Sequence, residues 1–170
     1  MDLVLIRHAI AVEPEDAPSD AERPLSGRGQ KRFRKAVRGL LRLDLRLDHV
    51  FHSPWQRAAE TAAMLGPLLV GDADERLEVT ELLTDSPGES LLALTDRFAP
   101  ETRVGFVGHE PWMGELLSLL VAGTPAHAEA LAFKKGGVAW LTGTPRPGHM
   151  RLLALLPPRL LRRLAEPVAS

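Results

Sequence analysis

The sequence predicts an α/β fold with a largely parallel central sheet. Two observations indicate this fold: apolar runs typical of buried strands recur along the chain, and stretches with helical periodicity or helix-start signals separate them. The length of 170 residues and the hydrophobic content of 45% suit one compact core. We therefore expect a single domain that spans residues 1–170.

The expected strands are short apolar runs. The first lies at the start of VLIRHAIAVE (4–13), where the apolar run meets Arg7 and His8. Two prolines, Pro157 and Pro158, end the last strand because proline cannot continue the hydrogen-bond ladder. The other expected strands are HVFHS (49–53), the start of RVGFVGHEP (103–111), GGVAWLTG (136–143) and MRLLALL (150–156).

The first expected helix follows an acidic loop at residues 13–24. Its apolar side chains recur at i, i+3, i+4, i+7 and i+8 from Phe33, and Ser26 is its expected N-cap. The other faces of this helix are basic over residues 31–42. Such a face is typical of solvated surface, although a partner with an acidic surface stays possible.

The later helices carry start and stop signals of their own. Ser53 and Gln56 have the spacing of a capping box, with Pro54 at the first helical position. The segment SPGE (86–89) repeats this pattern, and Gly123 ends a helix that begins near Pro111. A short terminal helix is expected in RLLRRLA (159–165).

Composition excludes several classes of protein. A net charge of −1 gives no support for a nucleic-acid or membrane partner, and no apolar stretch approaches the ~20 residues of a membrane span. The absence of cysteine excludes disulfides, thiolate zinc sites and cysteine nucleophiles. The first residues lack the basic region of a signal peptide, and we expect a cytoplasmic protein.

Unusual polar residues follow three of the expected strands. Arg7 and His8 follow the first, Ser53 leads to Arg57 after the second, and His109 follows the strand at 103–108. Ligands of open α/β sheets bind beyond the carboxyl ends of the strands, so these side chains converge if the strands are neighbours. Each residue alone can be ordinary surface; the joint arrangement favours a site.

The chemistry of this set suits a phosphoryl group. Two guanidinium groups, Arg7 and Arg57, match the oxygens of a phosphoryl group better than lysine ammonium groups would. The same positive charges disfavour protonation of His8, which keeps its imidazole neutral and nucleophilic. The N-terminus of the helix after Pro54 would add backbone N–H donors.

Four segments of the chain form a recognisable set: LIRHA at the N-terminus, RPLSGRG (23–29), SPWQRAAETA (53–62) and VGHEP (107–111). Together they resemble the histidine phosphatase superfamily, and most closely its small phosphohistidine phosphatases of the SixA type, which have a phosphoglycerate mutase-like fold. The resemblance covers roughly residues 2–142 and implies a three-layer α/β/α sandwich. It implies that His8 is the nucleophile of a phosphohistidine intermediate, and that Arg7, Arg57 and His109 hold the phosphoryl group.

One residue departs from the superfamily pattern. The usual signature is Arg-His-Gly, whereas Ala9 stands in the third position here. Alanine is small enough for this position provided that the backbone does not need a positive φ.

The proton donor is the least defined part of the expected site. Glu81, in VTELLTD, lies where SixA-type proteins carry a similar segment and is our candidate, with a solvated carboxylate as the alternative reading. Glu110 is a second choice, and we also place Ser53 and Glu110 among the substrate-binding residues. Phosphohistidine needs no strong acid, because its leaving imidazole has a pKa of about 6.5 and can depart protonated.

The expected reaction is therefore a metal-independent phosphohydrolysis without a cofactor. His49 and His52 point to opposite faces of their strand and cannot jointly bind a metal, and none of the common nucleotide or metalloprotease motifs is present. The segment from Glu78 to Arg103 is too short for a large lid, so an open site favours a phosphohistidine protein as substrate. The alternatives are a small-molecule phosphomonoesterase and a phosphate-binding module without turnover.

Overall fold

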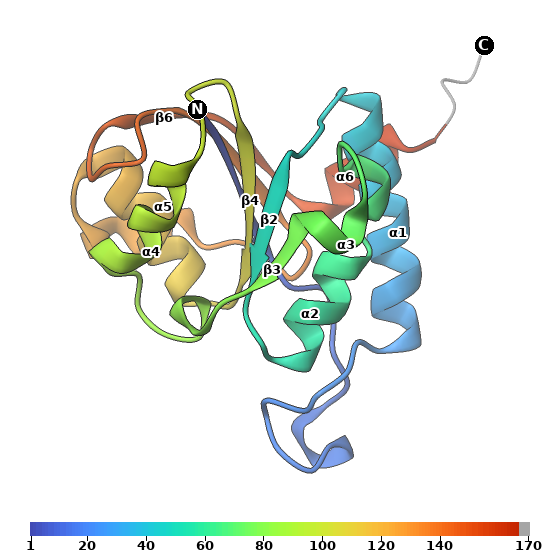
Figure 1. Cartoon of the computed structure of the whole chain (residues 1–170). Coiled ribbons are helices and arrows are strands. Elements are labelled where there is room, and N and C mark those ends of the chain that lie inside the picture. The colour runs from blue at the N-terminus through green and yellow to red at the C-terminus, as the bar shows by residue number, and fades with distance from the viewer. Residues whose placement is uncertain (167–170) are drawn as a thin grey trace.

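The computed structural model describes residues 1–166, whose central layer is a six-stranded sheet (Figure 1). The strand order is β3-β2-β4-β1-β5-β6. The pairs β1–β4, β2–β4 and β2–β3 are parallel, whereas β5 pairs antiparallel with both β1 and β6. The predicted, largely parallel sheet is thus confirmed. The strands are β1 (Asp2–Arg7), β2 (His49–His52), β3 (Leu77–Val79), β4 (Arg103–Gly108), β5 (Val138–Gly143) and β6 (Met150–Leu156).

The carboxyl ends of four strands lie at the same edge of the sheet. In the register, Arg7 of β1 lies opposite Gly108 of β4, and His52 of β2 lies opposite Val107. Because β6 runs antiparallel to β5, it runs parallel to β1 and ends at this edge too. The residues that follow β1, β2 and β4 are therefore neighbours, as the strand-end argument requires.

Helices cover both faces of the sheet, which confirms the three-layer arrangement (Figure 1). Helices α1, α2, α3 and α6 lie on one side, and α4 and α5 lie on the other. Within residues 1–166, no helix has both the length and the apolar character that a membrane crossing requires. The helices are α1 (Gly27–Arg42), α2 (Gln56–Ala63), α3 (Ala73–Arg76), α4 (Glu89–Ala93), α5 (Trp112–Ala122) and α6 (Pro158–Leu164), with short 3-10 helices η1 (Pro14–Asp16), η2 (Gly66–Leu68), η3 (Glu81–Leu83), η4 (Leu94–Arg97) and η5 (Pro125–Leu131).

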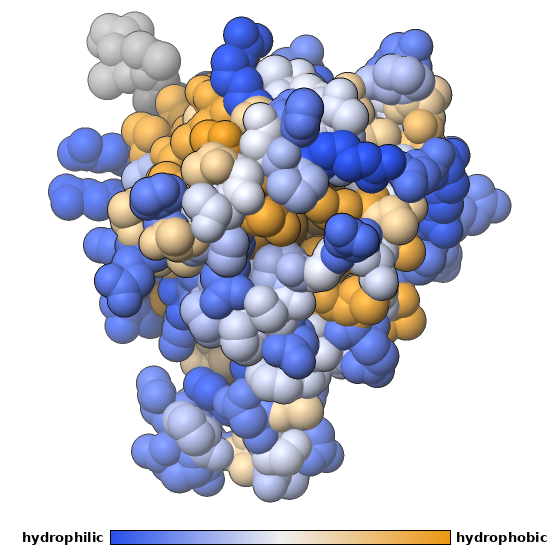
Figure 2. Space-filling model, turned by 90° about the vertical axis from the view of Figure 1, so that its left-hand side faces the viewer, coloured by the Kyte–Doolittle hydropathy of each residue, from blue (hydrophilic) through white to orange (hydrophobic). Residues whose placement is uncertain are grey.

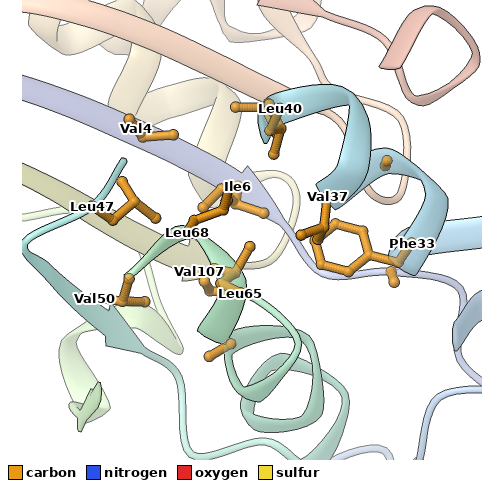
Figure 3. Packing of buried hydrophobic residues seen from close by; sticks show 14 of the residues in the cluster. Val4, Ile6, Phe33, Val37, Leu40, Leu47, Val50, Leu65, Leu68 and Val107 are labelled. Carbon is orange, nitrogen blue, oxygen red and sulfur yellow. The ribbon is translucent and has the colours of Figure 1, made fainter. Parts of the chain in front are cut away.

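Strand β1 is buried on both of its faces. Figure 3 shows Val4 and Ile6 of β1 in the core that also contains Val37 and Leu40 of α1. The alternate residues of β1 join a second core under α5. Double burial explains why this strand reads as a continuous apolar run, and it fixes the direction in which the chain leaves the sheet at Arg7.

Several predicted helix ends are confirmed. The Oγ of Ser26 accepts the backbone N–H of Gly29 at 3.1 Å, so this serine is the N-cap of α1. Gly123 follows α5 with φ of 76°, a left-handed conformation that glycine adopts at little cost. The predicted terminal helix is present as α6.

The two predicted capping patterns at Ser53 and Ser86 are wrong. Helix α2 begins at Gln56 with Trp55 as its N-cap residue, and Ser53 lies two residues before this N-cap. Its hydroxyl accepts the backbone N–H of Trp55 and contacts His109, so it is engaged in the site. Likewise, α4 begins after Gly88, and the Ser86 hydroxyl donates to the carboxylate of Glu115 at 2.6 Å.

The loop at residues 13–24 projects as a separate lobe from the edge of the sheet at which β1, β2 and β4 end (Figure 1). Figure 2 shows that the surface of this lobe is largely hydrophilic. Its base is closed by a bridge between Ala11 and Leu25 and by Arg23, which donates two hydrogen bonds to the carbonyl of Val12. The lobe is therefore tied to the chain just beyond β1.

Candidate active site

The three strand ends bring five polar residues into one buried cluster. These residues are Arg7, His8, Ser53, Arg57 and His109. The rings of His8 and His109 are 5.0 Å apart, and the Nε of Arg57 lies 3.3 Å from the Nε2 of His8. His8, Arg57 and His109 each expose 5% or less of their surface. The predicted convergence is thus present in the structure.

The two ring nitrogens of His8 have different partners. Nδ1 lies 2.7 Å from the carbonyl oxygen of Ala9, so it carries the proton and donates it. The lone pair therefore resides on Nε2, which accepts a hydrogen bond from Arg57. The backbone N–H of Ala9 donates to the hydroxyl of Thr61 on α2 at 3.0 Å, which holds this turn in place.

Ala9 fits the position where the superfamily usually has glycine. Asp44 is the one non-glycine residue with a positive φ among residues 1–166, so the backbone at Ala9 needs no left-handed conformation. Its side chain is buried in the core beside α1.

Burial keeps both histidines of the cluster neutral. The pKa of His8 is lowered to about 3, mainly by burial and in smaller part by the charges of His109, Arg57 and Arg7, whereas the hydrogen bond to Ala9 raises it. Burial likewise lowers the pKa of His109 to about 4, with Arg57 as the next cause. The sequence pointed to the arginines as the reason for a neutral His8; the structure makes desolvation the larger cause.

The guanidinium group of Arg57 is held by Asp20 of the projecting lobe. Nη2 of Arg57 donates to Oδ2 of Asp20 at 2.9 Å, and Nη1 donates to the Asp20 backbone carbonyl. Arg23 binds the other carboxylate oxygen of Asp20 at 2.7 Å. Sequence reasoning missed Asp20, because an acidic residue in an acidic loop has no distinctive pattern. Its position three residues before Arg23, at the start of RPLSGRG, was the available signal.

Arg7 is held from the opposite side by the chain before β5. Its Nη1 donates to the carbonyl of Phe133 at 2.5 Å, and the N–H of Phe133 donates to Oε1 of Glu110 at 2.7 Å. The other oxygen of Glu110 accepts the N–H of Gly114 at 3.2 Å. Glu110 therefore differs from our expectation: its carboxylate binds two backbone amides and braces the turn that follows β4.

Ser53 positions His109. Its hydroxyl lies 2.9 Å from Nε2 of His109 and accepts the N–H of Trp55. The hydroxyl can donate to Nε2 or accept a hydrogen bond from it, so this contact orients the ring of His109 in either neutral tautomer. Among residues 1–166, three buried side-chain nitrogens have no hydrogen-bond partner: Nε of Arg7, Nδ1 of His109 and Nε of Arg76. The first two belong to this cluster.

Trp55 lies at the rim of the cluster. Its ring is 4.6 Å from that of His109, and the guanidinium carbon of Arg57 also lies 4.6 Å from the Trp55 ring. Glu81 begins η3, directly beyond β3, and its side chain is exposed. The carbonyl of Leu83 in η3 lies 3.5 Å from a Cβ built at Gly108, so this segment borders the end of β4.

Comparison with known proteins defines the class of this chain. The family model of the histidine phosphatase superfamily (branch 1) matches residues 3–84. An uncharacterised protein from Picosynechococcus is 30% identical over 156 residues, which covers 91% of this chain and 90% of that protein. The chain belongs to the histidine phosphatase superfamily, and a phosphatase activity is supported.

Two solved structures have folds similar to that of this chain but differ in their sequence identity to it. The protein histidine phosphatase SixA, solved in complex with tungstate, has a TM-score of 0.78 and 27% identity to this chain, and the match covers 95% of this chain and 99% of that one. A phosphoserine phosphatase mutant from Entamoeba histolytica in complex with phosphoserine has a TM-score of 0.71 at 15% identity, covering 94% and 98% of the two chains. The first supports the SixA-type resemblance, whereas the second shows a shared fold.

Proposed function

We propose that this chain is a protein phosphohistidine phosphatase that works through a phosphorylated His8. The observation that carries this proposal is the state of His8: a buried, neutral imidazole whose Nδ1 donates to Ala9 and whose Nε2 lone pair faces Arg57. A nucleophile surrounded by guanidinium groups suits attack on an anionic phosphoryl group.

The reaction has two steps in this proposal. Nε2 of His8 attacks phosphorus, a P–N bond forms, and the bond from phosphorus to the leaving group breaks. Water then attacks the phosphorus, the P–N bond to His8 breaks, and inorganic phosphate leaves. Arg57 gives up its hydrogen bond to Nε2 when the phosphoryl group arrives and donates to a phosphoryl oxygen instead.

Two buried nitrogens of the cluster fit the same step. In this proposal the Nε proton of Arg7 and a proton on Nδ1 of His109 are donated to phosphoryl oxygens, and the Phe133 carbonyl and Ser53 hold these side chains in place. Donors that are oriented before the substrate binds stabilise the charge of the transition state without further reorganisation. This assigns the binding of the phosphoryl group to Arg7, Arg57 and His109.

Phosphohistidine is the proposed substrate for two reasons. Its imidazole leaving group can depart protonated, so the reaction does not require a buried acid, and Glu81 is exposed. The short segment between β3 and β4 also leaves room for a protein substrate. Similarity to SixA, named a protein histidine phosphatase, supports this choice.

We also propose that the reaction is metal-independent and takes place in the cytoplasm. Within residues 1–166, no three His, Asp or Glu side chains gather in a way that could hold a metal ion. A chain without cysteine is compatible with a reducing compartment.

The test compares three kinds of substrate on the same enzyme in the presence and absence of EDTA. A phosphohistidine protein, a phosphoserine peptide and p-nitrophenyl phosphate are the substrates, and release of phosphate is the readout. We expect the highest kcat/KM on the phosphohistidine protein and no effect of EDTA. A higher kcat/KM on the small ester would instead favour a phosphomonoesterase, and binding of phosphate without turnover would favour a binding module.

The role of Glu81 is tested in the same assay with Glu81→Gln. If Glu81 protonates the leaving group, the variant loses most activity on alkyl phosphates, whose alkoxide leaves poorly, and much less on phosphohistidine. Equal losses on both would reject the acid role. No loss on either would make Glu81 a solvated carboxylate.

A further inference from the structure

A basic groove continues from the active site along the β1–β5–β6 side of the same sheet edge. The groove has a volume of about 640 Å³ and shares Arg7 with the active site. Six cationic side chains line it: Arg7, Arg32, Lys134, Lys135, Arg159 and Arg162. Among the described residues that line this groove, none is acidic.

Backbone contacts hold two of these cations beside the nucleophile. The N–H of Gly136 is shared between the carbonyls of Arg7 and His8, at 3.1 and 3.0 Å, and the N–H of Arg7 donates to Gly137. Lys134 and Lys135 directly precede this pair of glycines, and both are exposed. These bonds therefore hold the backbone beside Lys134 and Lys135 next to Arg7 and His8, although the lysines follow His8 by more than 120 residues.

The other cations come from the contact between α1 and α6. Gly39 of α1 lies against the backbone of α6 so closely that a Cβ at this position would be 2.0 Å from the carbonyl oxygen of Leu161. This contact brings Arg32 near Arg162: repulsion from Arg28, then burial and repulsion from Arg162, lower the pKa of Arg32.

The positive charge of the groove is not compensated within the protein. Arg32, Lys134, Lys135, Arg159 and Arg162 form no ion pair with any carboxylate among residues 1–166. By contrast, Lys35 of α1 is paired with Glu166 at 2.6 Å. Uncompensated cations that share one groove attract an anionic partner.

We infer that this groove binds an acidic segment of the protein substrate, next to the residue that carries the phosphoryl group. The inference rests on the proposed function, because it assigns the groove to the same substrate. An acidic flank would lie along Lys134, Lys135 and Arg162 while the phosphoryl group occupies the space between Arg7 and Arg57.

Two observations favour an acidic polypeptide over a nucleic acid. The part of the groove that the structure describes has no aromatic ring in its lining, whereas proteins that bind single-stranded nucleic acids typically stack bases on aromatic side chains. The groove also adjoins an apolar pocket of about 260 Å³, lined by residues that include Phe133 and Leu155 and sharing Lys134 and Pro157 with the groove. Apolar space beside a basic groove suits the mixed side chains of a protein surface.

The experiment uses charge reversal in the groove with a matched control. The groove variant is Arg32→Glu/Lys135→Glu/Arg162→Glu. The control variant, Lys31→Glu/Arg34→Glu/Arg38→Glu, changes the net charge equally on exposed positions of α1. A neutral version of the groove variant, with Gln at all three positions, serves if the reversed one does not fold, as judged by circular dichroism and Tm.

Each protein is assayed on a phosphohistidine peptide with four flanking glutamates, on the same peptide with four glutamines, and on phosphoramidate. We expect the groove variant to raise KM for the acidic peptide about tenfold, equivalent to the loss of three weak exposed ion pairs. Its kcat, its KM for the glutamine peptide and its activity on phosphoramidate should match wild type, as should all values of the control variant. The difference in KM for the acidic peptide between the groove variant and wild type should vanish in high salt.

Equal effects in the groove and control variants, or none in either, would overturn the inference. A 5′-phosphorylated oligonucleotide that competes at a lower concentration than the acidic peptide would also overturn it and make the groove a nucleic-acid site. Failure of the proposed function can be told apart from failure of this inference. If wild type hydrolyses no phosphohistidine, fluorescence anisotropy measures how tightly the wild type and the same variants bind the unphosphorylated acidic peptide. Weaker binding by the groove variant alone would support the inference, and equal binding by all proteins would overturn it.

Discussion

His8 differs from an ordinary strand-end histidine in the protonation of its two ring nitrogens. The carbonyl of Ala9 fixes the proton on Nδ1, and burial removes the competing protonation of Nε2. A histidine with a pKa near 6.5 would be partly protonated at slightly acidic pH, and the protonated fraction cannot act as a nucleophile. With a pKa of about 3, His8 stays nucleophilic across the physiological range.

The low pKa of His8 predicts how stability changes with pH. The unfolded chain binds a proton at His8 below pH 6.5, whereas the folded chain does so only near pH 3, so the free energy of unfolding falls as the pH decreases through this window. By pH 5 this residue should account for a loss of about 2 kcal/mol. Urea unfolding at pH 7 and pH 5 measures the loss, and His8→Gln should show a smaller one. The same loss in both proteins would contradict a buried neutral His8.

Asp20 is a positioning residue in this account, because it touches Arg57 and acts through it. Removing its carboxylate in Asp20→Ala frees Nη2 of Arg57, while Nη1 keeps its bond to the backbone carbonyl of residue 20, and we expect kcat/KM to fall roughly tenfold for every substrate. Asp20→Asn keeps an acceptor for Arg57 and should lose less. Asp16→Asn, an exposed acid on the same loop, is the control and should keep wild-type activity. An unchanged or raised kcat/KM in Asp20→Ala would show that the contact does not orient Arg57.

At the scale of the elements, the ends of helices depend on what else their capping residues contact. Ser26 caps α1 as its sequence pattern predicts, and its hydroxyl also reaches the carbonyl of Ile10 at 3.2 Å. Ser53 has an equally good capping pattern in the sequence, but its hydroxyl contacts His109, and α2 begins after Trp55 instead. Local patterns cannot reveal such a conflict, because the competing partner lies 56 residues away along the chain.

The contact between α1 and α6 gives a prediction about stability. Gly39→Ala places a Cβ 2.0 Å from the Leu161 carbonyl, so α6 must move, and we expect a loss of roughly 1–3 kcal/mol in the free energy of unfolding. Gly27→Ala, in the first turn of the same helix, is the control: among the described residues, nothing lies within 4 Å of its Cβ. Chemical denaturation measures both. Equal stabilities of the two variants would mean that the α1–α6 contact is looser than described.

At the scale of the whole molecule, the order of the strands decides which residues meet. The alternation of apolar runs and helices was enough to predict the layers, and the chemistry of Arg7, His8, Arg57 and His109 was enough to predict which strand ends belong together. The order β3-β2-β4-β1-β5-β6 was not readable from these patterns, because pairing between distant strands leaves no local trace. For the same reason, the basic groove could not be foreseen from residues 32, 134, 135 and 162.

The central claim is that the phosphoryl group passes through Nε2 of His8. The most direct test is to mix enzyme with a ³²P-labelled phosphohistidine protein, quench within milliseconds, and locate the label. We expect an acid-labile, base-stable phosphoryl group on His8, attached to Nε2 because Nδ1 is committed to Ala9, and no turnover in His8→Ala. Label on another residue, or full activity of His8→Ala, would contradict the account.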